Sequence, residues 1–276
     1  MSKKQVRKKR EQNLVDICIP VYGQFELLEK CLLSIPEAAG NISYQIYIFD
    51  NNSPIEEVGS FYTDLDKSIR VIKNKTNIGF PGSCNRMVAA GRSPLLFLLN
   101  SDVILHKDSI DNLVKVMDEP KVGVVGMKLI FPEETDLPHK MGQRPSGKLQ
   151  HIGLTTNIRA EVQHAFIGWS PDHPRVNAQS EVFAVTGAAM MTRRDIWRRV
   201  GGFFEGYGMG TYEEVDFQMV VRELGYNILV EPEASGIHYT GATAERYGLG
   251  YNLRNNQMLF MQRWGSKIMW WQYKQC

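Results

Sequence analysis

The sequence predicts an α/β fold in which a mainly parallel central sheet is flanked by helices. Short apolar strands alternate with amphipathic helices from residue 15 onward, which is typical of parallel sheets covered on both faces. The run 95–99 is apolar at every position, as expected for a strand in the middle of such a sheet. Polar turns directly follow two strands, at 50–54 and 100–102, and sheets of this kind bind ligands at that edge.

The first half of the chain carries the clearest secondary-structure signals. Runs of β-branched, aromatic and aliphatic residues predict strands at 15–21, 44–49, 69–72, 95–99 and 122–126. The first helix has apolar residues spaced for one face, and these are Leu27, Leu28, Cys31, Leu32 and Ile35. Pro36 is expected to end that helix, and a second helix is expected over 82–90.

The pattern weakens between residues 132 and 180, where long loops with short strands are expected. The elements predicted after it are a strand at 182–185, a helix at 194–200, a glycine-rich loop at 201–210, a helix at 213–224 with Thr211 as a candidate cap, and a strand at 228–230. A last amphipathic helix is predicted at 255–273. Its apolar stripe either packs on the domain or lies on a membrane surface.

Composition excludes several classes of protein. The 276 residues are 43% hydrophobic with a net charge of +2, so a globular core is expected and no overall field demands a polyanionic partner. No apolar run approaches the ~20 residues needed to cross a bilayer. The four cysteines lack the spacing of a zinc or redox site. We therefore expect a cytoplasmic protein.

Residues 1–13 predict a basic, flexible tail. Its cations are Lys3, Lys4, Arg7, Lys8, Lys9 and Arg10. A charge block at a terminus is usually a solvated segment. The alternatives are peripheral contact with anionic lipid at the inner membrane surface and contact with a nucleic acid backbone, because either partner attracts clustered cations.

Three groups of residues have the chemistry of a catalytic site. Asn100-Ser101-Asp102 places a carboxylate at the sheet edge, and a divalent cation commonly binds through one or two carboxylates plus substrate phosphates. Glu213, Glu214 and Asp216 open a helix; they either compensate its dipole or, by crowding, raise the pKa of a working base. The third candidate is His238, which otherwise serves as a structural histidine.

Together these segments resemble the family 2 glycosyltransferases, the large inverting family with the GT-A fold, and most closely its rhamnosyltransferase-like branch. The matching pieces occur in family order over about residues 14–240: Ile19-Pro20-Val21-Tyr22, Phe49-Asp50-Asn51-Asn52-Ser53, Asn77-Ile78-Gly79-Phe80 through Asn85, Leu98-Leu99-Asn100-Ser101-Asp102-Val103, Val185-Thr186-Gly187-Ala188-Ala189, Gly201-Gly202-Phe203-Phe204-Glu205, and Glu213-Glu214-Val215-Asp216 through Arg222. Seven pieces in the correct order are hard to obtain by chance.

The resemblance implies a role for each matching position. Donor binding is implied for Pro20, Tyr22, Asp50, Asn52, Gly79, Asn85, Asn100, Ser101 and Asp102. Asp102 is implied to bind the metal, Mn²⁺ or Mg²⁺, with His238 completing the metal and diphosphate site. Acceptor binding is implied for Gly187, Ala188 and Asp216. Glu214 matches the catalytic base, although Glu replaces the usual Asp, so Glu213 stays an alternative. Asn100 replaces the first aspartate of the metal motif.

The resemblance also implies how the chain is organised and what it does. Residues 14–131 form a nucleotide-sugar-binding half, residues 132–250 a smaller acceptor-binding and catalytic half, and residues 251–276 the C-terminal helix. The expected reaction is inverting transfer of a hexose or deoxyhexose from a nucleoside-diphosphate sugar to a glycan or glycolipid in polysaccharide biosynthesis. The alternatives are a nucleic acid or protein acceptor for the same enzyme class, and a non-catalytic module that binds sugar nucleotides.

Overall fold

The computed structural model describes residues 13–133, 145–157, 159 and 161–275. The six basic residues of the predicted tail lie outside these ranges. The strands are β1 (Val15–Val21), β2 (Tyr44–Asp50), β3 (Arg70–Lys73), β4 (Leu95–Leu99), β5 (Val103–Leu105), β6 (Val122–Ile130), β7 (Leu149–His151), β8 (Leu154–Thr156), β9 (Val162–His164), β10 (Ser180–Glu181), β11 (Ala189–Arg193) and β12 (Asn227–His238). The helices are α1 (Phe25–Ala39), α2 (Ile55–Val58), α3 (Phe61–Asp64), α4 (Gly79–Ala90), α5 (Ser109–Met117), α6 (Arg194–Val200), α7 (Glu213–Glu223), α8 (Ala242–Tyr247) and α9 (Leu253–Gln275).

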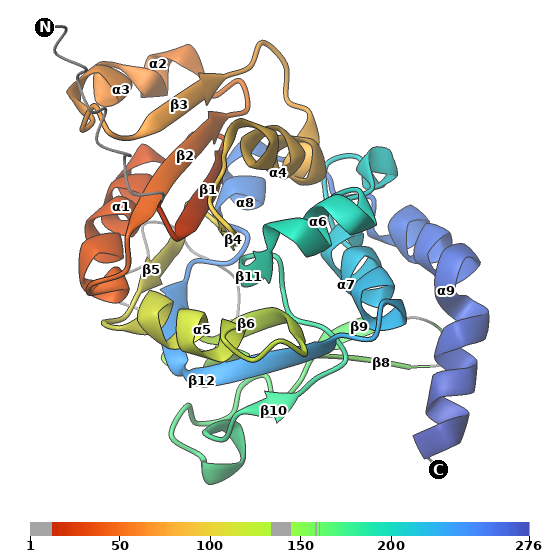
Figure 1. Cartoon of the computed structure of the whole chain (residues 1–276). Helices are drawn as coiled ribbons and strands as arrows, with labels where there is room; N and C mark the ends of the chain where they lie inside the picture. The colour runs from red at the N-terminus through yellow and green to blue at the C-terminus, as the bar shows by residue number, and fades with distance from the viewer. Residues whose placement is uncertain (1–12, 134–144, 158, 160, 276) are drawn as a thin grey trace, which may run out of the picture.

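The described strands form one large sheet and a small hairpin (Figure 1). The sheet runs in the order β10-β12-β6-β11-β4-β1-β2-β3, and β8 pairs with β9 in the hairpin. Strands β4, β1, β2 and β3 are parallel to one another, as are β6 and β12, while β11 lies antiparallel between β4 and β6. The predicted α/β fold is confirmed, with a mixed sheet in which parallel strands carry the first half.

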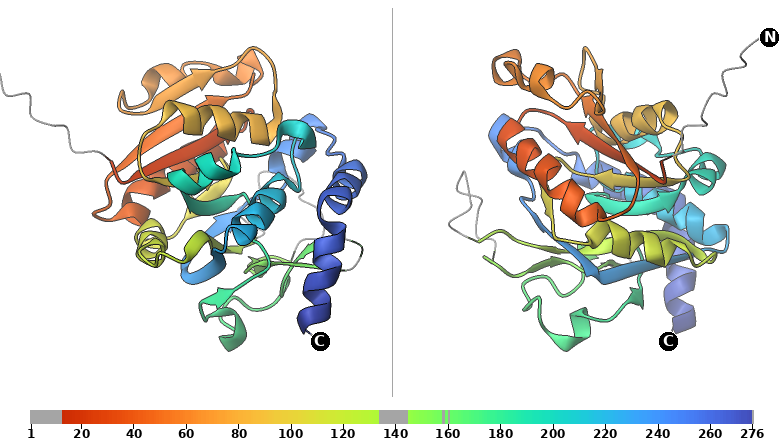
Figure 2. Two further views of the ribbon diagram at one scale, coloured as in Figure 1. Left: turned by 45° about the vertical axis from the view of Figure 1, so that its right-hand side comes forward. Right: turned by 60° about the vertical axis from the view of Figure 1, so that its left-hand side comes forward.

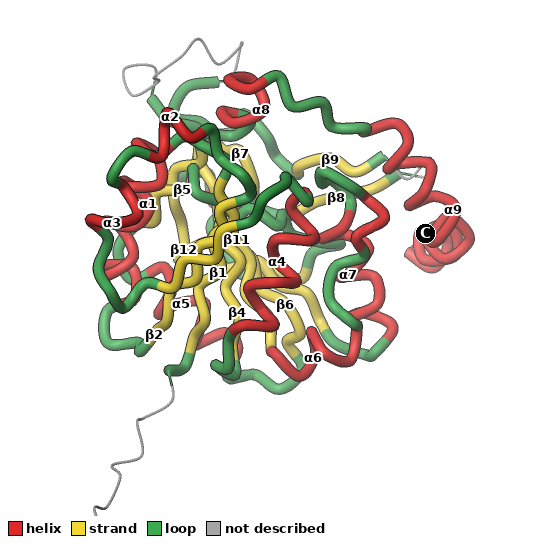
Figure 3. The backbone as a smooth tube through the Cα atoms, turned by 90° about the horizontal axis from the view of Figure 1, so that it is seen from above, coloured by secondary structure: helices red, strands yellow, loops and turns green. Residues whose placement is uncertain are grey.

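Helices cover both faces of this sheet (Figure 3). Helices α1 and α5 pack on one face, in a core that includes Leu28, Ile35 and Leu113. On the other face α4, α6 and α7 supply buried side chains such as Met87 and Trp197. Strand β4 is buried at all five positions, as its apolar sequence predicts. The carboxyl ends of β1, β2 and β4 therefore open at one rim of a sheet that is held from both sides.

Two predicted elements are wrong. Helix α1 does not end at Pro36 but continues to Ala39, because the exposed proline ring lies in the last turn, where only one intrahelical hydrogen bond is lost. Residues 182–185 form no strand beyond a single bridge from Ala184 to Leu154; the strand that inserts between β4 and β6 is β11, a little further on. Which segment becomes the strand depends on its pairing with β4 and β6, and the local sequence pattern carries no information about that pairing.

The C-terminal helix α9 lies along one side of the molecule (Figure 2). Phe260, Trp264 and Ile268 are buried against Tyr207 and Met219, so this part of its apolar stripe packs on the domain. On the same helix Met258 is 63% exposed. In the described part of the chain, no helix combines the length and the apolar character needed to span a membrane.

A buried ion pair joins the two halves of the sheet. Arg194 Nη2 lies 2.5 Å from Asp16 Oδ2, and Ser93 Oγ donates to Asp16 Oδ1 at 2.6 Å. Asp16→Ala is expected to lower the free energy of unfolding by about 3–5 kcal/mol, because it leaves a buried guanidinium without its partner. Denaturant unfolding measures this loss. The control is Asp111→Ala, which removes an exposed pair with Lys115 and should cost under about 1 kcal/mol. If Asp16→Ala and Asp111→Ala lowered the free energy of unfolding equally, the buried pair would not have the stabilising role assigned to it here.

Candidate active site

A cleft opens at the carboxyl ends of β1, β2 and β4. It is lined by Pro20, Val21, Tyr22, Asn51, Asn77, Gly79, Phe80, Asn100, Ser101, Asp102, Met209, Gly241, Thr243, Ala244, Leu249 and Tyr251. Six of the predicted donor-site residues are among them, drawn from the ends of β1 and β4 and from the start of α4. The remaining wall comes from the loop before α7 and from the segment around α8. The prediction from topology, that this rim carries the ligand site, therefore coincides with a cleft.

Asp102 and His238 meet at one end of the cleft, although 136 positions separate them in the sequence. Asp102 follows β4 and precedes β5, and β5 pairs with β12 so that Val103 lies opposite His238. A backbone hydrogen bond from Tyr239 N to Asp102 O, 3.0 Å long, fixes the same approach. Asp102 Oδ1 and His238 Nε2 lie 3.3 Å apart, and both side chains are buried.

The hydrogen bonds around His238 suit a metal ligand. Gln150 Oε1 lies 3.1 Å and Thr240 Oγ1 2.9 Å from His238 Nδ1, so Nδ1 carries the hydrogen and Nε2 presents a lone pair to Asp102. Asp102 Oδ1 and Asn100 Oδ1 are buried and have no hydrogen-bond donor among the described residues. A cation would provide a partner for Asp102 Oδ1, Asn100 Oδ1 and His238 Nε2. Two neighbouring ligands of an octahedral ion with bonds of about 2.1 Å lie about 3 Å apart, close to the observed spacing.

The protein supplies few ligands for such an ion. In the ranges described, no group of three His, Cys, Asp or Glu side chains gathers as a complete metal site. An ion held by Asp102 and His238 therefore needs further oxygen ligands. Substrate phosphates and water commonly fill these positions on Mg²⁺. The chemistry of the two residues fits a cation that binds together with a diphosphate.

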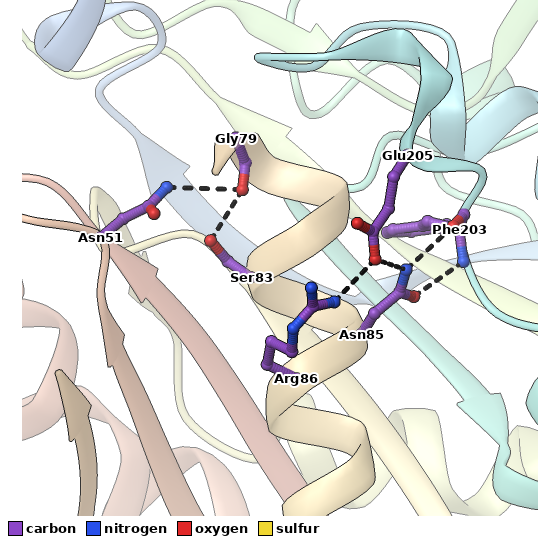
Figure 4. Close-up of polar contacts among 7 residues, drawn as sticks. All are labelled: Asn51, Gly79, Ser83, Asn85, Arg86, Phe203 and Glu205. Atoms are coloured by element: carbon purple, nitrogen blue, oxygen red, sulfur yellow. Dashed lines mark hydrogen bonds and ion pairs between the residues drawn. The ribbon is translucent and has the colours of Figure 1, made fainter. Parts of the chain in front are cut away.

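The donor side of the cleft is organised by Asn51, which sequence reasoning did not single out. Asn51 Nδ2 donates to Asn77 Oδ1 at 2.6 Å, and Asn51 Oδ1 accepts from Ile78 N at 2.8 Å. Asn51 and Ser83 also reach the carbonyl of Gly79 at the start of α4 (Figure 4). Gly79 has φ of +75°, and a Cβ there would lie 2.0 Å from the Gly208 carbonyl, so only glycine fits. The local signal was an amide directly after a strand.

Three predicted donor residues do not line the cleft. Asp50 is buried, and its Oδ1 accepts from Ser53 N at 2.8 Å, which shapes the turn after β2. Asn52 occupies that turn with φ of +70° and is exposed. Asn85 bonds both the N–H and the carbonyl of Phe203 and so ties α4 to the loop before α7 (Figure 4). This geometry supports positioning roles for Asp50 and Asn85.

The segment around α8 closes over the donor side. Tyr247 stacks edge-on against Tyr22 with 5.2 Å between ring centroids. Its hydroxyl donates to Glu57 Oε2 at 2.5 Å and accepts from Gln24 N at 3.1 Å, and Arg246 pairs with Glu57 at 3.3 Å. These contacts hold a C-terminal segment on the rim of β1 and α2. No sequence signal identified it, because the partners lie about 190 and 223 residues apart.

Glu213 and Glu214 lie at the start of α7, where Glu213 is buried and Glu214 is half-buried. Burial and the negative charge of Glu214 raise the pKa of Glu213 well above its usual range. Burial also raises the pKa of Glu214, while backbone N–H groups, that of Gly187 included, act in the opposite direction. Each side chain keeps one buried oxygen without a partner among the described residues. Two carboxyl groups with raised pKa values are candidates for proton transfer.

Thr211 does not cap α7. The N-cap residue is Tyr212, with φ of +73°, and Thr211 Oγ1 instead accepts from Asn256 Nδ2 at 3.0 Å. Two consecutive residues with positive φ are unusual outside glycine, and such backbones concentrate at functional sites. The turn aims the first two carboxyl groups of the helix, so the predicted cap is wrong and the predicted helix start is right.

The turn 186–188 lies against the start of α7. A Cβ on Gly187 would lie 3.3 Å from Glu214 Cβ, and the Ala188 carbonyl accepts from Asn100 N at 2.8 Å. The segment is fixed to α7 by Gln218, whose Oε1 accepts from Val185 N at 2.8 Å. Gly187 and Ala188 therefore connect the end of β4 with Glu214, and their role in acceptor binding stays a prediction.

Asp216 faces away from the cleft. Its carboxylate accepts from Tyr207 Oη at 3.1 Å, from Arg263 Nε at 2.6 Å and from Trp264 Nε1 at 2.6 Å. Arg263 and Trp264 belong to α9, so Asp216 joins α7 to the C-terminal helix. With three donors in place, this geometry supports an anchoring role for Asp216 and not contact with an acceptor.

Comparison with known proteins decides the family. The profile of Glycosyl transferase family 2 matches residues 16–200, a stretch that contains β1, the Asn100–Asp102 turn and the turn at Gly187. This chain belongs to glycosyl transferase family 2. Two curated relatives, an uncharacterized protein of Sinorhizobium fredii and the O-antigen biosynthesis protein RfbC of Myxococcus xanthus, are 25% and 23% identical over 238 residues. The alignments cover 83% of this chain but only 25% and 17% of those longer proteins.

Comparison with solved structures confirms that this family 2 glycosyltransferase has the GT-A fold. A mannosyltransferase from Pyrobaculum calidifontis, solved with GDP-Man and Mn²⁺, aligns with a TM-score of 0.57 and 16% identity over 85% of this chain and 60% of its own. GalNAc-T7, solved with UDP, GalNAc and Mn²⁺, aligns with a TM-score of 0.63 and 13% identity over 83% and 44%. These two likenesses show the fold that the sequence predicts.

Proposed function

We propose that this glycosyltransferase transfers a sugar from a nucleoside-diphosphate sugar to a hydroxyl of a glycan or glycolipid, with inversion and with a divalent cation. The observation that carries the proposal is that metal-side and base-side groups converge on Tyr251. Burial, Asp102 and Glu213 together raise the pKa of Tyr251. A Cβ on Gly210 would lie 3.8 Å from both Tyr251 Cε1 and Glu213 Oε1. Tyr251 lines the cleft together with Asp102, so the base-side carboxyl groups adjoin the cleft that would hold the donor.

The metal-side and base-side residues have distinct tasks. Asp102 and His238 would hold the cation, which supplies positive charge to a departing diphosphate. Beside the cleft, Glu214 accepts the proton of the acceptor hydroxyl as that oxygen attacks the anomeric carbon. The bond from the anomeric carbon to the diphosphate breaks as the new glycosidic bond forms on the opposite face. Glu213 is the alternative base.

Relatives and structural neighbours support the substrate classes. RfbC is an O-antigen biosynthesis protein, which favours a surface glycan as acceptor, and the neighbouring structures hold GDP-Man or UDP together with Mn²⁺. Transfer of rhamnose and a cytoplasmic site of action stay predictions. The two other candidates are a nucleic acid or protein acceptor and a non-catalytic module. The buried carboxyls with raised pKa values favour the enzyme over the module.

A panel of sugar nucleotides tests the proposal through thermal unfolding with and without Mn²⁺. A donor at 100 times its Kd stabilises the fold by about 2.7 kcal/mol, which corresponds to a rise in Tm of about 5–10 °C for a protein of this size. The rise should require Mn²⁺. With the best donor and a glycan acceptor, NMR of the product should show inverted anomeric configuration. Stabilisation without donor hydrolysis or transfer to any acceptor would favour the binding module.

A further inference from the structure

Strand β7 lies between the two ends of the active site. Its three residues, Leu149, Gln150 and His151, are all buried, and the strand pairs with β6. Successive side chains of a strand point to opposite faces, so Gln150 and His151 reach in opposite directions. Each of these two side chains contacts a different part of the catalytic machinery.

Gln150 contacts the metal side. Its Oε1 lies 3.1 Å from His238 Nδ1 and is 2% exposed with the rest of the side chain. A hydrogen bond at this nitrogen orients the imidazole and keeps its other nitrogen unprotonated. Gln150 therefore sets the direction in which His238 Nε2 presents its lone pair beside Asp102.

His151 contacts the base side. Its Nε2 accepts from Thr186 N and from Gly153 N, each at 3.3 Å. Thr186 begins the turn whose next residue, Gly187, hydrogen-bonds Glu214 through its backbone N–H and lies against that side chain. His151 thus holds the backbone that holds Glu214.

His164 fixes the tautomer of His151. The two Nδ1 atoms lie 2.9 Å apart, and because His151 Nε2 accepts two backbone hydrogens, His151 Nδ1 is the donor and His164 Nδ1 the acceptor. Burial, with His164 and His238 nearby, lowers the pKa of His151 well below its usual range. The ring stays neutral and keeps Nε2 as an acceptor.

We propose that Gln150 and His151 are positioning residues that set His238 and Glu214 separately from one short strand. This inference rests on the proposed function for its meaning but not for its test. The two variants must have separable effects: substitution of Gln150 changes cation binding, and substitution of His151 changes the environment of Glu214. A residue pair that merely filled the core would alter both sites together or neither.

The test of Gln150 uses calorimetry of Mn²⁺ binding in the presence of UDP or GDP. Gln150→Leu removes the acceptor at nearly the same volume and should weaken Mn²⁺ binding by about 10–100-fold, the usual effect of removing a partner of a metal-bound histidine. Gln150→Glu keeps an acceptor oxygen and should restore most of the affinity. His151→Asn should leave the affinity for Mn²⁺ within about threefold of the wild-type value, because His151 hydrogen-bonds the backbone of Thr186 and Gly153 and not His238.

The test of His151 follows the carboxyl carbon of Glu214 by NMR as the pH is changed, assigned by its loss in Glu214→Gln. The titratable groups coupled to Glu214 are Glu213 and Tyr212, which both remain. His151→Asn places its amide one methylene short of Thr186 N, so the turn relaxes and Glu214 titrates at higher pH. His151→Gln can place Oε1 where Nε2 was and should titrate as the wild type does. The control is His173→Asn, on a histidine whose Nδ1 accepts from Arg175 N, two residues further on, and whose ring packs against Trp169.

These outcomes separate the inference from the function. Unchanged Mn²⁺ affinity in Gln150→Leu, unchanged titration in His151→Asn, or equal effects of both variants on both measurements overturns the inference. Failure of the His151→Gln rescue, with a folded protein, also overturns it. Absence of transfer by the wild type contradicts the proposed function alone, because neither measurement requires turnover.

Discussion

Glu214→Gln should lower kcat by about 10²–10⁴-fold, the usual contribution of a general base. The amide has nearly the shape of the carboxyl group but cannot accept the proton of the attacking hydroxyl. Donor binding should survive, because Glu214 lies beside the turn at Gly187 and not among the residues that line the donor cleft. Single-turnover transfer and donor calorimetry measure the two quantities. Full activity of this variant would exclude Glu214 as the base.

The matched variant Glu213→Gln decides between the two neighbouring carboxyls. If Glu214 is the base, Glu213→Gln should keep kcat within about tenfold of the wild type. Its effect should instead appear in stability. The folded-state pKa of Glu213 is raised, so its stabilising contribution is complete below the usual pKa of Glu and is lost as pH rises through the raised value. Glu213→Gln removes that loss and should unfold at a higher temperature at alkaline pH.

The pH profile of the wild type provides a second check on the base. A general base acts only when deprotonated, so kcat should fall as pH decreases through the raised pKa of Glu214. The fall should begin at higher pH than an exposed Glu would give. A profile that stayed flat down to the usual pKa range of Glu would contradict the buried environment that the structure assigns to this residue.

Local sequence patterns predicted most of the elements that carry the site. An apolar run next to a polar turn identified β4 and Asp102. Both signals are local, because a strand buried on both faces is apolar at successive positions and its end is marked by the polar residues that follow. The acids of α7 were found in the same way. His238 was found as a single residue, but its distance from Asp102 depends on the pairing of β5 with β12, which only the fold contains.

The rest of the site depends on contacts between distant segments. Tyr251 lines the cleft and Tyr247 packs against Tyr22 of its lining, both from beyond β12, and nothing in their local sequence marks them as site residues. Asp216 lies two residues after Glu214 but points the other way, because a helix turns by about 100° per residue and therefore by about 200° over two residues. Position in a motif therefore predicts the region of a site better than it predicts the direction of a side chain.

Asp102→Ala should reduce the Mn²⁺-dependent affinity for the donor by at least about 10²-fold, since even an indirect partner of a ligand contributes about 10–100-fold. The variant removes the carboxylate and leaves His238 and the Asn100 oxygen, too few ligands for a cation that binds with a diphosphate. Calorimetry of UDP and GDP binding with and without Mn²⁺ measures the effect. The metal-independent part of donor affinity should persist, because Asn51 and Tyr22 still form the other wall.

Asn100→Asp is the matched variant in the opposite direction. Its Oδ1 is buried without a donor at the same strand end, and a second carboxylate there adds a negative ligand for the cation. Mn²⁺ affinity should rise in Asn100→Asp and fall in Asp102→Ala. If both variants left Mn²⁺ binding unchanged, the cation would not be held at this strand end. If Asn100→Asp weakened it, repulsion between two buried carboxylates would outweigh their attraction for the ion, and the amide at position 100 would then be what allows Asp102 and His238 to bind a cation at this spacing.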